Sequence, residues 1–246
     1  MAERSFAKHL SLLQFLGITD GEMPDVLAQK IGHMDIAVII DNSLSMLEVE
    51  PCMLSNNMVV DRSRLDQAAL FYNTMVSVFE AANIRYTTYT MLEKVNTFIQ
   101  TPFTNDVGYV NSGGTPTITT IVRALSEGTK DILLIIITDG QPTDCEQWAF
   151  IPKIKELQRN YKRGKVYMSF VACTENQSDI EFMNKLDKKV RNVDVSDDYQ
   201  SEFNEILRVT GKPISYNKYI TKAIIGSVVP ELDTLDEDTK CRCTIA

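Results

Sequence analysis

Two hydrophobic patterns alternate along this chain of 246 residues. Continuous apolar runs at 34–41 and 131–138 are rich in Ile, Leu and Val, which is typical of strands buried on both faces of a parallel sheet. Between them, apolar residues recur at helical spacing, most clearly over 62–82. Because strands separated by helices pair in parallel, the pattern predicts a doubly wound, mostly parallel α/β sheet with helices on both faces.

The same hydrophobic patterns predict the order of the remaining helices and strands. Helices are expected over 4–16 and 24–31, before the first strand. An unusually long connection follows that strand, from 47 to 60, and we expect it to be an ordinary surface loop. The later elements are expected to be strands at 84–91, 95–99, 165–173 and 190–195, and helices at 115–127, 146–160, 178–187 and 198–209.

The expected organisation is one α/β domain with extensions at both ends. We predict an N-terminal helical extension at 1–33, the domain at 34–210, a C-terminal helix at 211–230 and an acidic flexible tail at 231–246. The amphipathic stretch 216–229 is expected to pack back onto the domain, and a helix that binds a partner is the alternative.

Polar residues gather where the two buried strands end. The first strand enters Asp41-x-Ser43-x-Ser45, and the strand at 131–138 is followed directly by Asp139. A third polar loop contains Thr115, directly after two glycines, and opens a helix. Because ligands collect at the carboxyl ends of strands where the strand order reverses, we expect these loops to meet. Carboxylate and hydroxyl oxygens suit Mg²⁺ or Mn²⁺.

The ordered motifs DxSxS, GGT and TDG resemble the metal-ion-dependent adhesion site of von Willebrand factor A-type (vWA) domains. The resemblance spans roughly residues 34–210. It implies first-loop ligands, a second-loop ligand and a third-loop carboxylate that acts through water, and all five positions are present: Asp41, Ser43, Ser45, Thr115 and Asp139. Thr117 also lies in the second loop, but Thr115 follows the glycine pair as the family pattern has it.

The resemblance also implies a function. With a single direct carboxylate, Asp41, a divalent ion keeps surplus positive charge and an exchangeable position. An Asp or Glu of a partner protein can fill that position, so we expect an intracellular adaptor or scaffold that binds protein through Mg²⁺. The plain alternative is that Asp41 is a turn or cap residue and that Asp139-Gly140 is a common turn pair.

Catalysis is not expected from this sequence. A phosphatase of the haloacid dehalogenase type needs a second Asp two residues after the first, where this chain has Ser43. The only histidines, His9 and His33, both precede the first strand, so a Ser–His–Asp triad is unsupported. Phosphate-binding glycine motifs are absent from the sequence. A metal-dependent hydrolase and a structural domain with a non-functional metal site remain the alternatives.

The composition of the chain indicates which kinds of partner and which cellular compartment to expect. Acidic residues number 33 against 25 basic ones, a net charge of −8, and no basic cluster is interleaved with aromatic residues, so nucleic acid is not an expected partner. The five cysteines show no disulfide spacing, and the first residues lack the apolar core of a signal peptide. We therefore expect a reducing, cytoplasmic location.

The last four residues, Cys243-Thr-Ile-Ala246, fit a prenylation motif. An Ala at the end favours a farnesyl group on Cys243, and Cys241 could carry a second acyl chain. Because the acidic run at 231–238 offers no polybasic support, one lipid would hold the chain only weakly on the cytosolic face of a membrane. An unconstrained tail is the alternative.

Three further carboxylates lie near the expected metal loops. Glu48 and Glu50 follow Ser45 closely enough to reach the ion and occupy the partner's position from within, or they belong to an ordinary loop. Asp144 is expected to cap the helix at 146–160.

Overall fold

The protein is described by a computed structural model, which places residues 12–91, 94–95, 114–174 and 176–232. Its main sheet has six strands in the order β5–β4–β1–β6–β7–β8. Of its five pairs of neighbouring strands, four are parallel and one, β4–β5, is antiparallel. The strands are β1 (Asp35–Ile40), β4 (Thr87–Thr90), β5 (Lys94–Val95), β6 (Ile132–Thr138), β7 (Val166–Ala172) and β8 (Val193–Ser196). The predicted doubly wound α/β fold is therefore confirmed.

The two apolar runs lie side by side, as expected. β1 pairs in parallel with β6 from Asp35 opposite Ile132 to Ile40 opposite Ile137. From β1 the chain goes to β4 on one side, and it later returns to β6 on the other. The strand order thus reverses between β1 and β6, and the loops that follow these two strands share one edge of the sheet.

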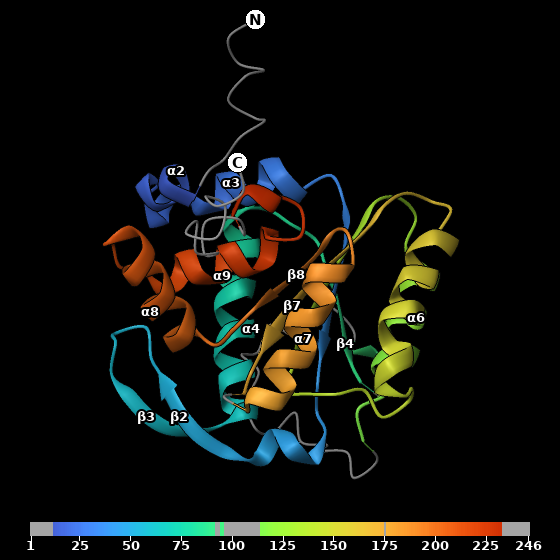
Figure 1. Ribbon diagram of the computed structural model, residues 1–246. Helices are drawn as coiled ribbons and strands as arrows, with labels where there is room; N and C mark the ends of the chain where they lie inside the picture. The colour runs from blue at the N-terminus through green and yellow to red at the C-terminus, as the bar shows by residue number, and fades with distance from the viewer. Residues whose placement is uncertain (1–11, 92–93, 96–113, 175, 233–246) are drawn as a thin grey trace, which may run out of the picture.

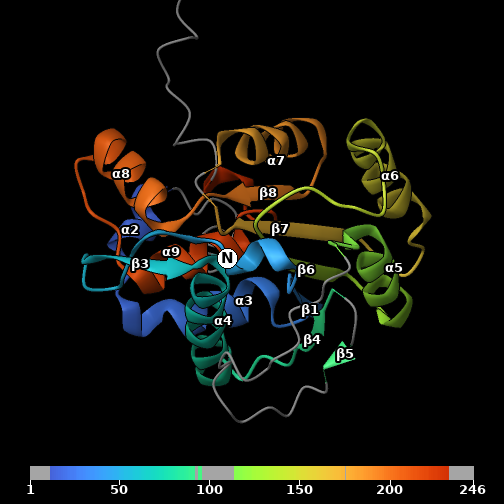
Figure 2. The same cartoon turned by 90° about the horizontal axis from the view of Figure 1, so that it is seen from below.

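Helices cover both faces of the sheet (Figure 2). One face carries α3 (Met23–Ile31), α4 (Arg64–Ala81) and α9 (Tyr216–Ile225), and the other carries α5 (Thr117–Glu127), α6 (Gln147–Asn160) and α7 (Gln177–Lys189). Successive residues of a strand point to opposite faces, so Val38 enters the first core and Ile39 the second. This double burial explains why β1 and β6 read as unbroken apolar runs.

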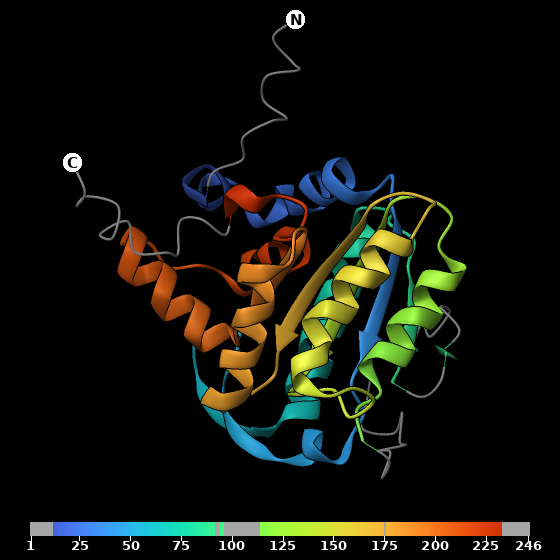
Figure 3. The same cartoon turned by 45° about the vertical axis from the view of Figure 1, so that its right-hand side comes forward.

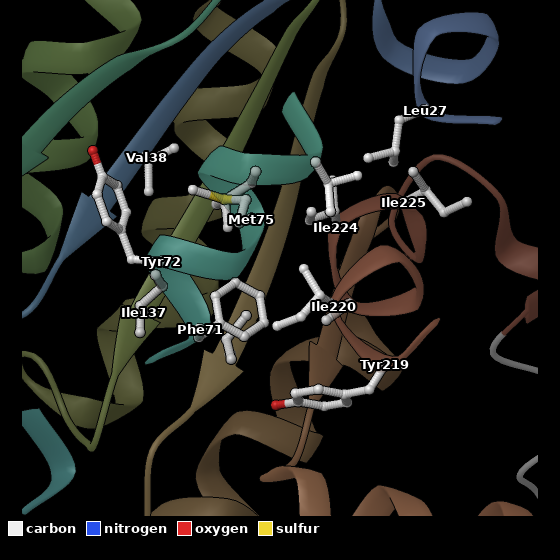
Figure 4. Packing of buried hydrophobic residues seen from close by; sticks show 14 of the residues in the cluster. Leu27, Val38, Phe71, Tyr72, Met75, Ile137, Tyr219, Ile220, Ile224 and Ile225 are labelled. Carbon is white, nitrogen blue, oxygen red and sulfur yellow. The ribbon is translucent and has the colours of Figure 1, made fainter. Parts of the chain in front are cut away.

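The C-terminal stretch packs back onto the domain, as predicted. In Figure 4, Ile220 and Ile224 of α9 lie beside Phe71 and Met75 of α4. The rings of Phe71 and Tyr219 meet edge to face, with centroids 6.0 Å apart. The N-terminal helix α2 (Leu12–Gly17) and α3 contribute to the same core. The predicted boundaries at 33/34 and 210/211 therefore do not coincide with a break in the packing.

The connection after β1 is not a loop, which corrects the expectation for 47–60. It forms an antiparallel hairpin of β2 (Val49–Met53) and β3 (Val59–Ser63), and β3 leads directly into α4. Proline is tolerated in a strand that has a free edge, so Pro51 can lie opposite Asp61 in this two-stranded ribbon. Figure 1 shows the hairpin at the lower end of α4, away from α2 and α3.

Two elements complete the structure around this frame. Helix α8 (Tyr199–Thr210) follows β8, and its first turn is capped by the side chain of Asp198, which accepts hydrogen bonds from the backbone of Gln200 and Ser201. Figure 3 looks onto α5, α6 and α7, with α8 beside α7. Among the described residues, no helix combines the length and the apolar character needed to cross a membrane.

Substituting Asp197 tests the cost of a buried charge between β8 and α8. Its Oδ1 is buried without a hydrogen-bond partner in the described part of the chain. Burial, and then Asp198 and Glu205, raise the pKa of Asp197 to about 6 against the opposing charge of Lys222. Because the folded state holds this proton more tightly than the unfolded state, the contribution of Asp197 to stability is greatest below about pH 4 and is lost as the pH rises through about 6.

We therefore expect Asp197→Asn to raise the free energy of unfolding at pH 7.5 by about 1–2 kcal/mol and to flatten its pH dependence between about 4 and 6. Urea denaturation at several pH values measures both effects, with the exposed Asp61→Asn as the control. A variant that is less stable than the wild type at pH 7.5 would contradict the assignment.

Candidate metal centre

The carboxylate of Asp41 is fully buried at the end of β1. Its Oδ1 accepts a hydrogen bond from the backbone N–H of Ser43 at 2.9 Å, and its Oδ2 accepts one from the Thr138 hydroxyl at 2.7 Å. The first contact is the local turn that the plain alternative expected. The second ties the end of β1 to the last residue of β6, so Asp41 lies at the point where the strand order reverses.

Two hydroxyls of the same loop face one another. The chain enters the 3₁₀ helix Leu44–Leu47 directly after Ser43, and the Oγ atoms of Ser43 and Ser45 lie 3.0 Å apart. Two neighbouring ligands of an octahedral Mg²⁺, each at about 2.1 Å, are separated by about 3.0 Å. The spacing of these two oxygens therefore fits adjacent positions on one such ion.

The second and third loops are joined through their backbones. The N–H of Thr115 donates to Oγ1 of Thr143 at 2.7 Å, and the N–H of Thr143 donates back to the carbonyl of Thr115 at 2.9 Å. Gly114 has φ +91°, and a Cβ there would lie 2.6 Å from Oγ1 of Thr143. Glycine is thus required beside Thr115 both for its backbone conformation and for space.

Asp144 does not cap the helix that the sequence assigned to it. Its two carboxylate oxygens accept hydrogen bonds from the N–H groups of Ile118, at 3.2 Å, and Thr119, at 2.7 Å. It therefore caps α5 from outside that helix, while α6 begins after Glu146 without a side-chain cap. The sequence could not show this because the two N–H groups that Asp144 caps lie 26 and 25 residues before it.

The carboxylates of Asp41 and Asp139 are both buried and lie close enough for their charges to interact. The pKa of Asp41 is raised to about 6, chiefly by burial and further by the charge of Asp139, against the hydrogen bonds from Thr138 and Ser43. Asp139 is only 3% exposed. Buried negative charge beside hydroxyl oxygens favours a bound cation, so the donor set fits a divalent ion.

The predicted ligands stand as follows. Hydrogen bonds and charge link Asp41, Ser43, Ser45 and Asp139, and Thr115 is joined to the third loop through Thr143. In the parts of the chain that the structure describes, no group of three or more His, Cys, Asp or Glu side chains could hold a metal ion. A site here would therefore depend on hydroxyls, and the five-residue site remains a prediction. Cys241 and Cys243 lie outside the described residues.

Sequence reasoning missed Arg64. Its buried guanidinium donates from Nη1 to Oδ2 of Asp139 at 3.0 Å and from Nε to Oε1 of Glu50 at 2.9 Å. Nη2 also contacts Glu50, and it lies 2.9 Å from Oε2 of Glu48. Both glutamates, for which the sequence left open an approach to the ion or an ordinary loop, therefore bind Arg64. One signal was available: a basic residue in the first turn of a helix opposes the helix dipole.

No family model and no curated protein matches the chain. Among solved structures it is similar to the ArnB paralog VWA2 from Sulfolobus acidocaldarius, with 17% identity, a TM-score of 0.42, and coverage of 69% of this chain and 42% of that one. It is also similar to the D319A mutant of the PilB minor pilin from Streptococcus sanguinis, with 10% identity, a TM-score of 0.46, and coverage of 83% and 63%.

The chain thus spans less than two thirds of either protein. Likenesses at this level say nothing of function. The fold assignment rests on the topology of the sheet itself.

Proposed function

We propose that the chain is a protein-binding adaptor domain that captures an acidic residue of its partner at a Mg²⁺ or Mn²⁺ ion. The ion would be held by Asp41, Ser43, Ser45, Thr115 and Asp139. One observation carries the proposal: two buried carboxylates and two hydroxyls 3.0 Å apart gather at the reversal point of a doubly wound sheet.

The donor set suits recognition of an anion. When bound, the ion supplies a Lewis-acidic position that a carboxylate can occupy. The hydroxyls of Ser43 and Ser45 carry no charge, and Asp139 already shares its carboxylate with Arg64. The chain therefore neutralises the ion only in part, which favours a negatively charged ligand from outside.

The surface beside the site supports a protein as that ligand. Leu44 lies between the two serines and is 54% exposed, and Leu47 and Val49 are 47% and 66% exposed. Exposed apolar side chains around a polar centre are typical of protein interfaces, whereas small molecules favour enclosed pockets. Leu44→Ser is expected to weaken partner binding several-fold without changing the affinity for the cation.

The hydrolase alternative finds less support. His33 lies in the turn before β1, at the opposite end of that strand from Asp41, and His9 lies outside the described residues. A cytoplasmic location and prenylation at Cys243 rest on sequence alone and stay proposals. Mass spectrometry of the native C-terminus would test the second.

An array of synthetic peptides tests the proposed recognition directly. Peptides that contain Asp or Glu are paired with otherwise identical peptides that contain Asn or Gln. In Mg²⁺ the wild-type chain is expected to bind acidic members selectively, and both chelator and Thr115→Ala should remove that binding. Equal binding to acidic and amide peptides, or binding that survives the chelator, would overturn the proposal.

A further inference from the structure

Arg64 places a fixed positive charge at the candidate metal centre. Its guanidinium contacts the carboxylates of Glu48, Glu50 and Asp139, and its side chain is only 7% exposed. Asp139 is a predicted ligand position, and Oδ2 of Asp139 accepts from Arg64 at 3.0 Å. A cation that approaches the Asp139 carboxylate is therefore repelled by the guanidinium of Arg64, which already contacts that carboxylate.

The hairpin holds this charge in place. The backbone N–H of Arg64 donates to the carbonyl of Glu48 at 2.9 Å, which closes the hairpin against the start of α4. Glu50 accepts from Nε of the same guanidinium, and it also accepts from the Thr174 hydroxyl, just after β7, at 3.5 Å. The segment inserted between β1 and α4 thus carries the two glutamates that orient the arginine at the start of α4.

We propose that Arg64 is a tethered cation of the metal centre, which competes with the divalent ion for Asp139 and thereby sets the ion concentration at which the site fills. The inference rests on the proposed function. It assigns a specific role to the β2–β3 hairpin: this segment lowers the affinity for the cation by holding Arg64 against Asp139. Glu48 and Glu50 act through Arg64 and are positioning residues rather than ligands.

Isothermal titration of Mg²⁺ and Mn²⁺ into Arg64→Gln tests the proposal. Removing a like charge beside the ion is expected to tighten cation binding by roughly tenfold or more. Arg62→Gln is the matched control, because it removes the same charge from β3, two residues before Arg64, and within the described structure Arg62 has no ion pair with Asp139. It should change the affinity by less than about twofold. Arg64→Lys, which keeps the charge but not the forked geometry, should fall between wild type and Arg64→Gln.

The outcomes separate this inference from the proposed function. Cation binding by the wild type that is unchanged or weaker in a folded Arg64→Gln variant overturns the tethered cation and leaves the proposed function standing. Binding that appears only in Arg64→Gln supports the tethered cation and removes metal-dependent recognition by the native chain. Binding in neither protein overturns both.

A measurement on the wild type covers the case in which Arg64→Gln does not fold. The ¹⁵Nε resonance of Arg64 is followed by NMR during a titration with Mg²⁺. If the ion competes with Arg64 for Asp139, this resonance shifts as Mg²⁺ is added. The midpoint of the shift should equal the midpoint of the cation-binding curve. A resonance that stays in place up to high Mg²⁺ contradicts the proposal.

Discussion

Lys222→Met is expected to lower the free energy of unfolding by about 3–5 kcal/mol, the largest effect on stability that we predict. The ammonium of Lys222 on α9 lies 3.0 Å from Oε2 of Glu202 on α8, and the two side chains are 4% and 7% exposed. Removing the ammonium deprives the buried Glu202 carboxylate of this contact with a positive charge. The loss should be greater at pH 7.5 than at pH 5, because Lys222 also lowers the pKa of Asp197.

The double variant Lys222→Met, Glu202→Met separates the charge from the packing. It should recover most of the lost stability, since a buried ion pair is often replaceable by apolar side chains of similar size. Lys218→Met on the same helix is the control. Its ammonium donates to the carbonyl of Leu16, which is a neutral acceptor, so a loss of ~1 kcal/mol is expected. Urea denaturation of the four proteins measures these differences. A loss below about 1 kcal/mol in Lys222→Met would contradict the role of the pair.

Asp41→Ala is expected to weaken Mg²⁺ and Mn²⁺ binding by at least about 100-fold, because it removes the one carboxylate assigned to the ion directly. The metal-free variant should still fold. The variant loses the hydrogen bonds from Ser43 and Thr138. It also loses a carboxylate whose charge is costly to bury, since burial raises the pKa of Asp41 to about 6. The wild type should therefore gain thermal stability on addition of Mg²⁺, whereas the variant should not.

Asp61→Ala removes an equal charge from the exposed side of the hairpin and serves as the matched control. Its cation affinity and its Mg²⁺-dependent shift in melting temperature should match those of the wild type. Similar cation affinity in Asp41→Ala and the wild type would show that Asp41 is a turn residue only, as the plain alternative holds.

The sequence predicted most of the sheet because its strands are buried on both faces. In β6, from Ile132 to Thr138, every residue is buried, and an unbroken apolar run leaves few other interpretations. The hairpin gave no such signal. β2 and β3 form a two-stranded ribbon with mixed burial, and Pro51 lies within one strand, so neither alternation nor an apolar run marks them.

The same difference decides which parts of the candidate site could be predicted from the sequence. The three polar loops could be located because each follows a predicted strand or opens a predicted helix. Arg64 could not be placed, because its contacts with Asp139 join residues 75 positions apart and depend on the unpredicted hairpin. The cap that Asp144 supplies to α5 was missed for the same reason: a side chain can cap a helix that is distant in sequence.

We propose that the oxygens of the three loops share one divalent ion. An anomalous difference map from crystals grown with Mn²⁺ would locate this ion. We expect one strong peak at the ends of β1 and β6, within about 2.3 Å of the hydroxyl oxygens of Ser43, Ser45 and Thr115. A fully occupied Mn²⁺ peak elsewhere in the protein, with no peak between these hydroxyls, would contradict the proposed site.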